Sequence, residues 1–172
     1  MKAFGFTALV LLSSSIYLAK ASCSSRKCPS GWTSFGTNCY RFFNDPLRTW
    51  MDAETFCQTF STSGVKGHLT TIESSDENDF VNDFWKTMRP DKPASEQQSV
   101  WIGYSDRDEE GIFVGVEDGS VPAFTDWWPN QPNNYHSGQD CGSIWKPKDN
   151  DLGKWNDWTC TNTYGLICKI AL

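Results

Sequence analysis

The chain has 172 residues, of which 15 are basic and 21 acidic, so its formal net charge at pH 7 is −6. This length suits one domain with a single substantial core. The acidic balance argues against nucleic acid and anionic membrane surfaces as partners.

Residues 1–21 are predicted to be a secretory signal peptide. Lys2 is followed by a mostly apolar run and then by the small-x-small sequence at 19–21, which predicts cleavage before Ser22. The apolar run is shorter than the roughly 20 residues that a membrane-spanning helix needs, so export is favoured over a signal anchor. Cleavage removes Lys2 and Lys20 and no acid, leaving 13 basic and 21 acidic side chains, a net charge of −8. We therefore expect a secreted, extracellular protein without membrane insertion.

All the cysteines lie after this leader, at positions 23, 28, 39, 57, 141, 160 and 168. In an exported chain, six of them are expected to form three intramolecular disulfides, although spacing alone leaves their pairing open. Cys23 is the predicted odd one, because it lies two residues into the mature chain, where a terminus can reach another molecule. An interchain disulfide is favoured there over a free or capped thiol.

The first part of the mature chain predicts a hairpin, a strand and a helix. Residues 28–39 contain two glycines that flank two aromatic residues, as in a small hairpin closed by its own disulfide; 40–43 continue as a strand and 44–46 as a turn. Thr49 is a good N-cap for the helix, which residues 61–64 end. Three- and four-residue steps give this helix a buried stripe of Trp50, Ala53, Cys57 and Phe60.

A short strand over 68–72 is expected to precede a second helix. Ser74 and Glu77 form a capping-box pattern for that helix, and Arg89-Pro90 ends it before a polar loop over 91–98. The expected core stripe of this helix is Phe80, Val81, Phe84, Trp85 and Met88.

The remaining chain predicts short strands and long loops. Residues 100–104 are expected to form a buried strand, and the aromatic and turn residues that follow show no helical period. The further strand candidates are Ile112–Val116, Phe124, Cys141–Trp145 and Leu166–Ile170. Two helices followed by a loop-rich β half predict an α+β fold.

Oxygen-bearing side chains gather between Trp127 and Cys160. The triplet Gln131-Pro132-Asn133 is followed by Gln139-Asp140 and later by Asn156-Asp157, with no Cys or His at ligand spacing. Such oxygen ligands on irregular backbone favour a hard cation such as Ca²⁺ over zinc. A polar surface loop is the alternative, since the same residue types form turns.

With the cysteines, the W-I-G-Y sequence from Trp101, the Q-P-N triplet and the W-N-D sequence from Trp155 in view, the chain resembles the C-type lectin family. The likeness runs from Cys28 to Ile170 and is to the long, single-domain form found in soluble lectins of marine animals. It implies an N-terminal segment over 22–27 and a C-type lectin-like domain over 28–170, an α+β fold of two helices with short antiparallel sheets and long loops. The implied disulfides, which leave Cys23 over, are Cys28–Cys39, Cys57–Cys168 and Cys141–Cys160.

The resemblance also implies two Ca²⁺ sites. The ligands of the primary site, where Ca²⁺ and sugar bind together, would be Gln131, Asn133, Gln139, Asn156 and Asp157, with a cis bond before Pro132. An auxiliary site would use Asp106, Glu110, Asn134 and Asp140, and would share Gln139. The residues implied to contact carbohydrate are Gln131, Asn133, Tyr135, Gln139 and Asn156.

Two positions depart from the pattern of sugar-binding members. These usually carry Glu-Pro-Asn for mannose-type or Gln-Pro-Asp for galactose-type ligands, and Glu in place of Gln139. Asp157 is then the one carboxylate of the primary site, so weak Ca²⁺ binding is expected. Amide ligands also turn N–H donors outward and lack the acceptor that a sugar hydroxyl needs. Gln131 and Tyr135, at a position where galactose-binding members tend to place an aromatic ring, favour galactose-type ligands.

The sequence therefore predicts a secreted lectin that binds cell-surface glycans through Ca²⁺, with roles in agglutination and innate defence. The alternative is a domain of the same fold whose sugar site has decayed and which binds protein, mineral or ice without Ca²⁺. No enzyme is expected, because the cysteines are committed to disulfides and neither His68 nor His136 has a nucleophile at a recognisable spacing. A disulfide-linked homodimer through Cys23 would add avidity.

Overall fold

The computed structural model describes residues 27–91, 98–147 and 153–172. The expected leader, Cys23 and most of the expected polar loop over 91–98 lie outside these ranges. Within them, no helix combines the length and the apolar character that crossing a membrane requires.

Two helices and several short strands alternate along the chain. In order they are β1 (Thr33–Phe35), β2 (Asn38–Arg48), α1 (Trp50–Cys57), β3 (Ser61–Thr62), β4 (Val65–Lys66), β5 (His68–Leu69), α2 (Ser75–Met88), β6 (Gln98–Ser105), β7 (Val114–Gly115), β8 (Cys141–Lys146), β9 (Lys154–Trp158) and β10 (Tyr164–Ala171). This confirms the predicted α+β class.

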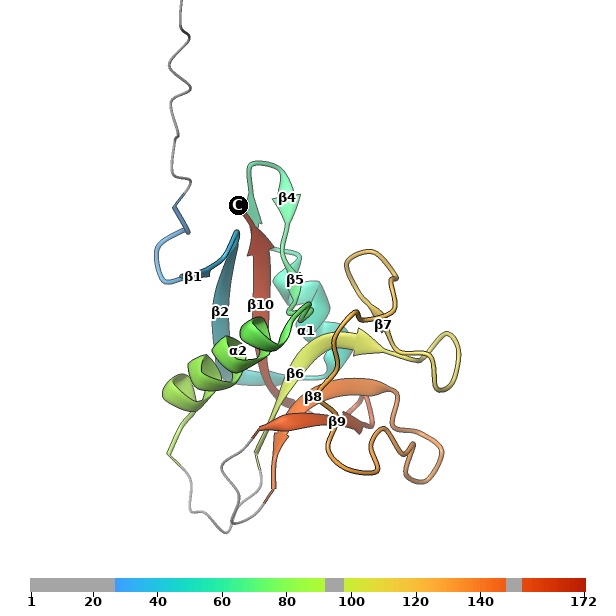
Figure 1. The fold of residues 1–172 in the computed structure, drawn as a ribbon. Coiled ribbons are helices and arrows are strands. Elements are labelled where there is room, and N and C mark those ends of the chain that lie inside the picture. Colours follow the sequence, from blue (N-terminus) through green and yellow to red (C-terminus); the bar gives the residue numbers. More distant parts are fainter. Residues whose placement is uncertain (1–26, 92–97, 148–152) are drawn as a thin grey trace, which may run out of the picture.

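One sheet carries most of the strands, in the order β1-β2-β10-β6-β8-β9, with β5 beside β10 and β7 beside β6 (Figure 1). Strands β3 and β4 form a separate hairpin. The strand pairs are antiparallel, as expected, except for β10 and β6, which run parallel.

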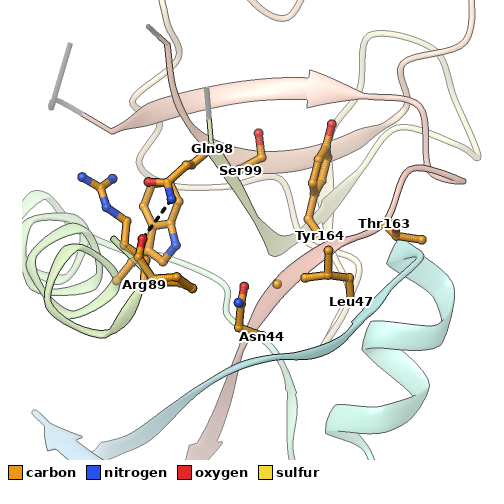
Figure 2. A pocket seen from close by; sticks show the side chains of 10 residues that line it. Asn44, Leu47, Arg89, Gln98, Ser99, Thr163 and Tyr164 are labelled. Carbon is orange, nitrogen blue, oxygen red and sulfur yellow. Dashed lines mark hydrogen bonds between the residues drawn. The ribbon is translucent and has the colours of Figure 1, made fainter. Parts of the chain in front are cut away.

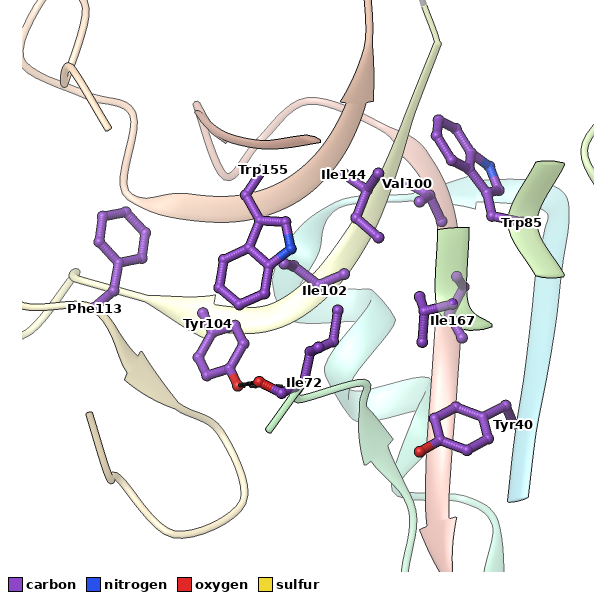
Figure 3. Packing of buried hydrophobic residues seen from close by; sticks show 11 residues of the cluster. Tyr40, Ile72, Trp85, Val100, Ile102, Tyr104, Phe113, Ile144, Trp155 and Ile167 are labelled. Carbon is purple, nitrogen blue, oxygen red and sulfur yellow. Dashed lines mark hydrogen bonds between the residues drawn. The ribbon is translucent and has the colours of Figure 1, made fainter. Parts of the chain in front are cut away.

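Strand β10 is buried on both faces, which explains its nearly continuous apolar sequence. Successive side chains of a strand point to opposite faces. Ile167 accordingly packs in a cluster with Val81 and Trp85 of α2 (Figure 3). Leu166 and Cys168 pack in a second cluster with the buried residues of α1. The helices thus cover different faces of the central strand.

The predicted helix starts are confirmed. The hydroxyl of Thr49 accepts a hydrogen bond from the N–H of Asp52 at 3.3 Å, and that of Ser74 accepts one from the N–H of Glu77 at 3.2 Å. The helical stripes were each predicted one residue too long, although Phe60 still packs against the core cluster that contains Cys57. Phe60 lies beyond the end of α1, and Met88 is 53 % exposed at the end of α2.

Several strand boundaries also differ from the prediction. Residues 44–46 form no turn, because Phe43 and Arg48 on either side of them both pair with β10, and the extra residues make a bulge within β2. Strand β9 was not predicted, and Phe124 lies in no strand. The expected strands over 68–72 and 112–116 shrink to β5 and β7, two residues each.

Three disulfides hold these elements together, and they are the pairs that the resemblance implies. Cys28–Cys39 closes the first hairpin, Cys57–Cys168 joins α1 to β10, and Cys141–Cys160 joins the start of β8 to the loop after β9. The last of these lies next to the loops that carry the predicted site.

Candidate functional site

Three strand ends meet where the predicted site residues lie. Ser105, the last residue of β6, pairs with Cys141, the first of β8, and Cys141 pairs with Trp158, the last of β9. Asp106 follows β6 directly, and Asn156-Asp157 lie near the end of β9. Antiparallel pairing of β6, β8 and β9 therefore brings together residues that are about fifty positions apart in the chain.

Asp157 ties β9 to the loop that precedes β8. Its side chain is fully buried, and its Oδ2 accepts hydrogen bonds from the N–H of Asn133 at 2.9 Å and of Asn134 at 2.7 Å. The bond between Gln131 and Pro132, just before these residues, is cis as expected. The other carboxylate oxygen, Oδ1, is buried and has no hydrogen-bond partner. A buried charged oxygen without a partner is costly, so a cation beside Oδ1 fits this carboxylate.

The amide side chains of the same loop bind its backbone. Asn134 Oδ1 accepts from the N–H of Gln139 at 3.1 Å. The N–H of Tyr135 donates to Gln139 Oε1 at 3.1 Å and to Asn133 Oδ1 at 3.0 Å. These bonds shape the loop without exhausting the amide oxygens, since a carbonyl oxygen has two lone pairs.

Gln131 and Asn156 complete the predicted primary set. Gln131 Oε1 is buried without a partner, while its N–H donates to the carbonyl of Trp128 at 2.9 Å. Asn156 is buried in β9, and its Nδ2 donates to the carbonyl of Asp157. The site thus offers one charged and one neutral oxygen without a partner, which is the donor chemistry of a hard-cation site.

A second group of acids surrounds Asp106. Its Oδ2 accepts from the N–H of Gly111 at 2.8 Å, and its Oδ1 is buried without a partner. Burial raises the pKa of Asp106, and the neighbouring carboxylates of Glu110 and Asp140 add to this rise. The N–H of Asp106 also donates to the carbonyl of Asp140 at 3.1 Å. A cation would relieve the repulsion between these carboxylates.

Neither group is a complete cage of acids. In the described part of the chain, no three His, Cys, Asp or Glu side chains come close enough to hold a metal ion by themselves. Amide and carbonyl oxygens would have to complete the coordination of a cation at either place, as Ca²⁺ accepts readily.

Tyr135 stands at the edge of the loop. Its side chain is 63 % exposed, and its ring centroid lies 4.0 Å from that of the neighbouring His136. An exposed aromatic ring beside polar groups can pack against the apolar face of a sugar.

Trp155 joins the two segments that carry the primary set. It is fully buried and stacks on Tyr104, with ring centroids 5.1 Å apart (Figure 3). The backbone N–H of Trp155 donates to the carbonyl of Asp126, and its backbone carbonyl accepts from the N–H of Trp128, both at 2.8 Å. The sequence prediction did not include Asp126. Its position, five residues before Gln131 and beside two tryptophans, was the available signal.

A cavity of about 330 Å³ lies elsewhere, at the end of β6 where Gln98 begins the strand (Figure 2). Asn44, Leu47 and Tyr164 line it, as does Arg89, whose guanidinium lies 5.0 Å from the ring centroid of Trp85. The residues described around it include no carboxylate. This cavity therefore lacks the carboxylate oxygens that a Ca²⁺ site needs.

Comparison with known proteins shows which proteins the chain is similar to. Residues 47–170 match the model of the Lectin C-type domain. The chain is 41 % identical over 154 residues to echinoidin of Heliocidaris crassispina, a match that covers 84 % of this chain and 97 % of echinoidin. It is 38 % identical over 149 residues to an alpha-N-acetylgalactosamine-specific lectin of Patiria pectinifera, covering 84 % and 83 % of the two chains. The crystal structure of the C-type lectin CEL-I from Cucumaria echinata aligns with a TM-score of 0.71 at 32 % identity, over 84 % of this chain and 97 % of that chain.

Proposed function

Because the chain belongs to the C-type lectin family, we propose that it is a secreted lectin that binds galactose-type glycans through Ca²⁺ held in the loops between β6 and β9. The observation that carries the proposal is the buried Asp157, one oxygen of which holds the loop while the other has no partner. A purely structural aspartate would be expected to use both oxygens.

The primary site would be formed by five side chains. These are Gln131, Asn133, Gln139, Asn156 and Asp157. When bound, Ca²⁺ supplies positive charge and open coordination positions for the hydroxyl oxygens of a sugar. The amide groups of Asn133 and Asn156 would donate N–H bonds to those hydroxyl oxygens. Since Asp157 supplies the single carboxylate, binding of the ion and of one sugar should be weak.

The auxiliary site would be formed by Asp106, Glu110, Asn134 and Asp140, with Gln139 shared between the sites. The raised pKa of Asp106 and its unpartnered Oδ1 support this assignment. Three of its proposed ligands are carboxylates, so once a cation brings them together this site should bind Ca²⁺ more tightly than the primary one. Its residues Asn134 and Asp140 flank the loop of the primary site, so its occupation should order that loop.

A preference for galactose-type sugars is supported by two observations. Tyr135 presents an exposed ring at the edge of the loop, where the apolar face of a galactose ring could pack. The similar protein of Patiria pectinifera is named for its specificity for alpha-N-acetylgalactosamine, a sugar of the galactose type.

A glycan array tests the proposal directly. The full mature chain should bind glycans ending in galactose or N-acetylgalactosamine in millimolar Ca²⁺ and lose them in chelator. Binding that survives the chelator, to glycan, protein, mineral or ice, would favour the decayed-site alternative. Calorimetry that finds no Ca²⁺ uptake at millimolar concentration would overturn the proposal.

Replacing Gln139 with Glu should tighten Ca²⁺ binding by about tenfold, because it gives the primary site a second carboxylate. The new side chain can still accept from the N–H of Tyr135, as Gln139 Oε1 does now. Calorimetric Ca²⁺ titration measures the change. Gln98→Glu, at the opposite end of β6, adds the same charge and serves as the control. An unchanged titration of Gln139→Glu would place residue 139 outside the metal site.

The N-terminal segment is proposed to link two chains through Cys23. Secretion is supported by the leader pattern and by the three disulfides, which form in oxidising compartments. Cys23→Ser should convert the dimer to a monomer and abolish agglutination, because weak single sites need avidity. Monosaccharide binding should remain. Sedimentation and an agglutination assay measure both; a Cys23→Ser chain that still agglutinates would refute the link.

A further inference from the structure

We propose that Asn78, on helix α2, is a positioning residue for the loop site: its side-chain amide aligns the two segments that carry the proposed Ca²⁺ ligands. The calcium part of this inference rests on the proposed function. The structural part, the alignment of the two segments, can be measured without any metal.

The amide of Asn78 is buried and both of its ends are engaged. The residue is 3 % exposed. Its Oδ1 accepts from the indole Nε1 of Trp155 at 2.9 Å, and its Nδ2 donates to Asp126 Oδ2 at 3.0 Å. An indole N–H can only donate and an ionised carboxylate can only accept, so the two partners admit one orientation of the amide. Asn78 therefore holds Trp155 and Asp126 in one position relative to each other.

These two partners lie at the junction of the site-bearing segments. Asp126 also contacts β9 directly at two places. Its backbone carbonyl accepts from the N–H of Trp155, and its Oδ1 accepts from Lys154 Nζ at 2.5 Å. Beyond this junction the chain leads to Gln131 on one side and to Asn156 on the other. The proposed ligands lie on either side of a junction to which α2 is hydrogen-bonded through the side-chain amide of Asn78.

This arrangement predicts how a substitution of Asn78 would affect the proposed Ca²⁺ site. Without the amide, the buried indole N–H loses its acceptor and Asp126 loses a donor. The backbone hydrogen bonds between segment 126–134 and β9 would then lack the support of α2, and a shift of this segment would move Gln131 and Asn133 away from Asp157. Groups that orient the metal ligands without binding the metal themselves typically contribute 10- to 100-fold to metal affinity. We expect a loss of about tenfold.

A charge-conserving swap tests the contact itself. Asn78→Asp keeps an acceptor for Trp155 but sets two carboxylates against each other, and Asp126→Asn sets an amide against an amide and weakens the bond to Lys154. Each single variant should bind Ca²⁺ about tenfold more weakly. In the double variant, the new carboxylate at 78 accepts from Trp155 Nε1 and from the new amide at 126. The hydrogen bond between residues 78 and 126 is restored with donor and acceptor exchanged. The Ca²⁺ affinity should therefore return to within about threefold of the parent.

Val81→Ala is the matched control for lost stability. Val81 is fully buried on the same helix, three residues from Asn78, and belongs to the apolar cluster that contains Trp155. It has no side-chain group to hydrogen-bond with the junction. This variant should unfold more easily while its Ca²⁺ affinity stays at the parent value.

Two measurements on the full mature chain decide the outcome: calorimetric Ca²⁺ titration, and amide hydrogen exchange over residues 126–134 in calcium-free protein. Faster exchange and weaker Ca²⁺ binding in the single variants, both restored by the swap, support the inference. Parent-like exchange and affinity in Asn78→Asp and Asp126→Asn would overturn it. If the parent takes up no Ca²⁺, the proposed function fails and the exchange data alone decide the role of Asn78. If Asn78→Asp does not fold, Asp126→Asn and the swap carry the comparison.

Discussion

Replacing Asp157 with Asn is expected to weaken Ca²⁺ binding by at least about 100-fold and to abolish glycan binding, while the domain stays folded. The new carbonyl oxygen can keep the bonds from the N–H groups of Asn133 and Asn134. The new NH₂ group then occupies the place of the unpartnered Oδ1 and directs N–H donors at the cation. The site also loses the one carboxylate of its primary set.

The control for this variant is Asp118→Asn, which removes the same formal charge from an exposed loop outside the site. Asp118 accepts a hydrogen bond from the N–H of Ser120 and belongs to neither of the two proposed ligand sets. Calorimetric titration and thermal unfolding in chelator should show parent affinity for Asp118→Asn, and similar stability for both variants. Parent-like Ca²⁺ affinity in Asp157→Asn would mean that the carboxylate serves the loop alone.

Replacing Glu77 with Gln is expected to lower the free energy of unfolding by about 3–5 kcal/mol. Glu77 Oε1 lies 2.9 Å from Lys169 Nζ and accepts from the hydroxyl of Tyr40 at 2.6 Å, and Oε2 accepts from the N–H of Glu73 at 2.9 Å. Both charged side chains of the ion pair are buried between α2 and β10. Burial and the adjoining Glu77 carboxylate also raise the pKa of Tyr40 well above its ordinary value. Removing one charge leaves the Lys169 ammonium buried without its counter-ion.

The double variant Glu77→Gln/Lys169→Met should recover more than half of this loss, because it removes the second buried charge as well. Glu73→Gln is the control, since Glu73 is an exposed carboxylate four residues earlier in the chain, just before the N-cap of α2. Urea unfolding at pH 7 measures all three. A cost below about 1 kcal/mol for Glu77→Gln would show that solvent screens the pair.

Features that depend on neighbouring residues could be predicted from the sequence. Thr49 and Ser74 cap helices because a hydroxyl reaches an N–H three residues on, whatever the rest of the chain does. The apolar stripes identified the buried apolar residues of each helix, but not the buried polar residues Glu54, Glu77 and Asn78. Motif order and spacing identified the family, and through it the disulfide pairs, the cis bond before Pro132 and the expected ligand set.

The errors fall where a residue's conformation depends on a distant partner. The sequence of β9 is typical of a polar loop, but the segment is a strand because each of its residues from Lys154 to Trp158 pairs with β8. Residues 44–46 contain turn formers, yet they lie in a bulge because β2 pairs with β10 on both sides of them. Met88 matches the helical period, but it is exposed because it ends α2.

The residue types, their order and the local starts of the helices are properties of the chain alone, since they depend on contacts a few positions apart. Two features of the site are decided by the tertiary structure. One oxygen of Asp157 accepts hydrogen bonds from the loop while the other has no partner, and the side chain of Asn78 accepts from the indole of Trp155. They arise because the pairing of β6, β8 and β9 and the packing of α2 bring together side chains that no local rule connects.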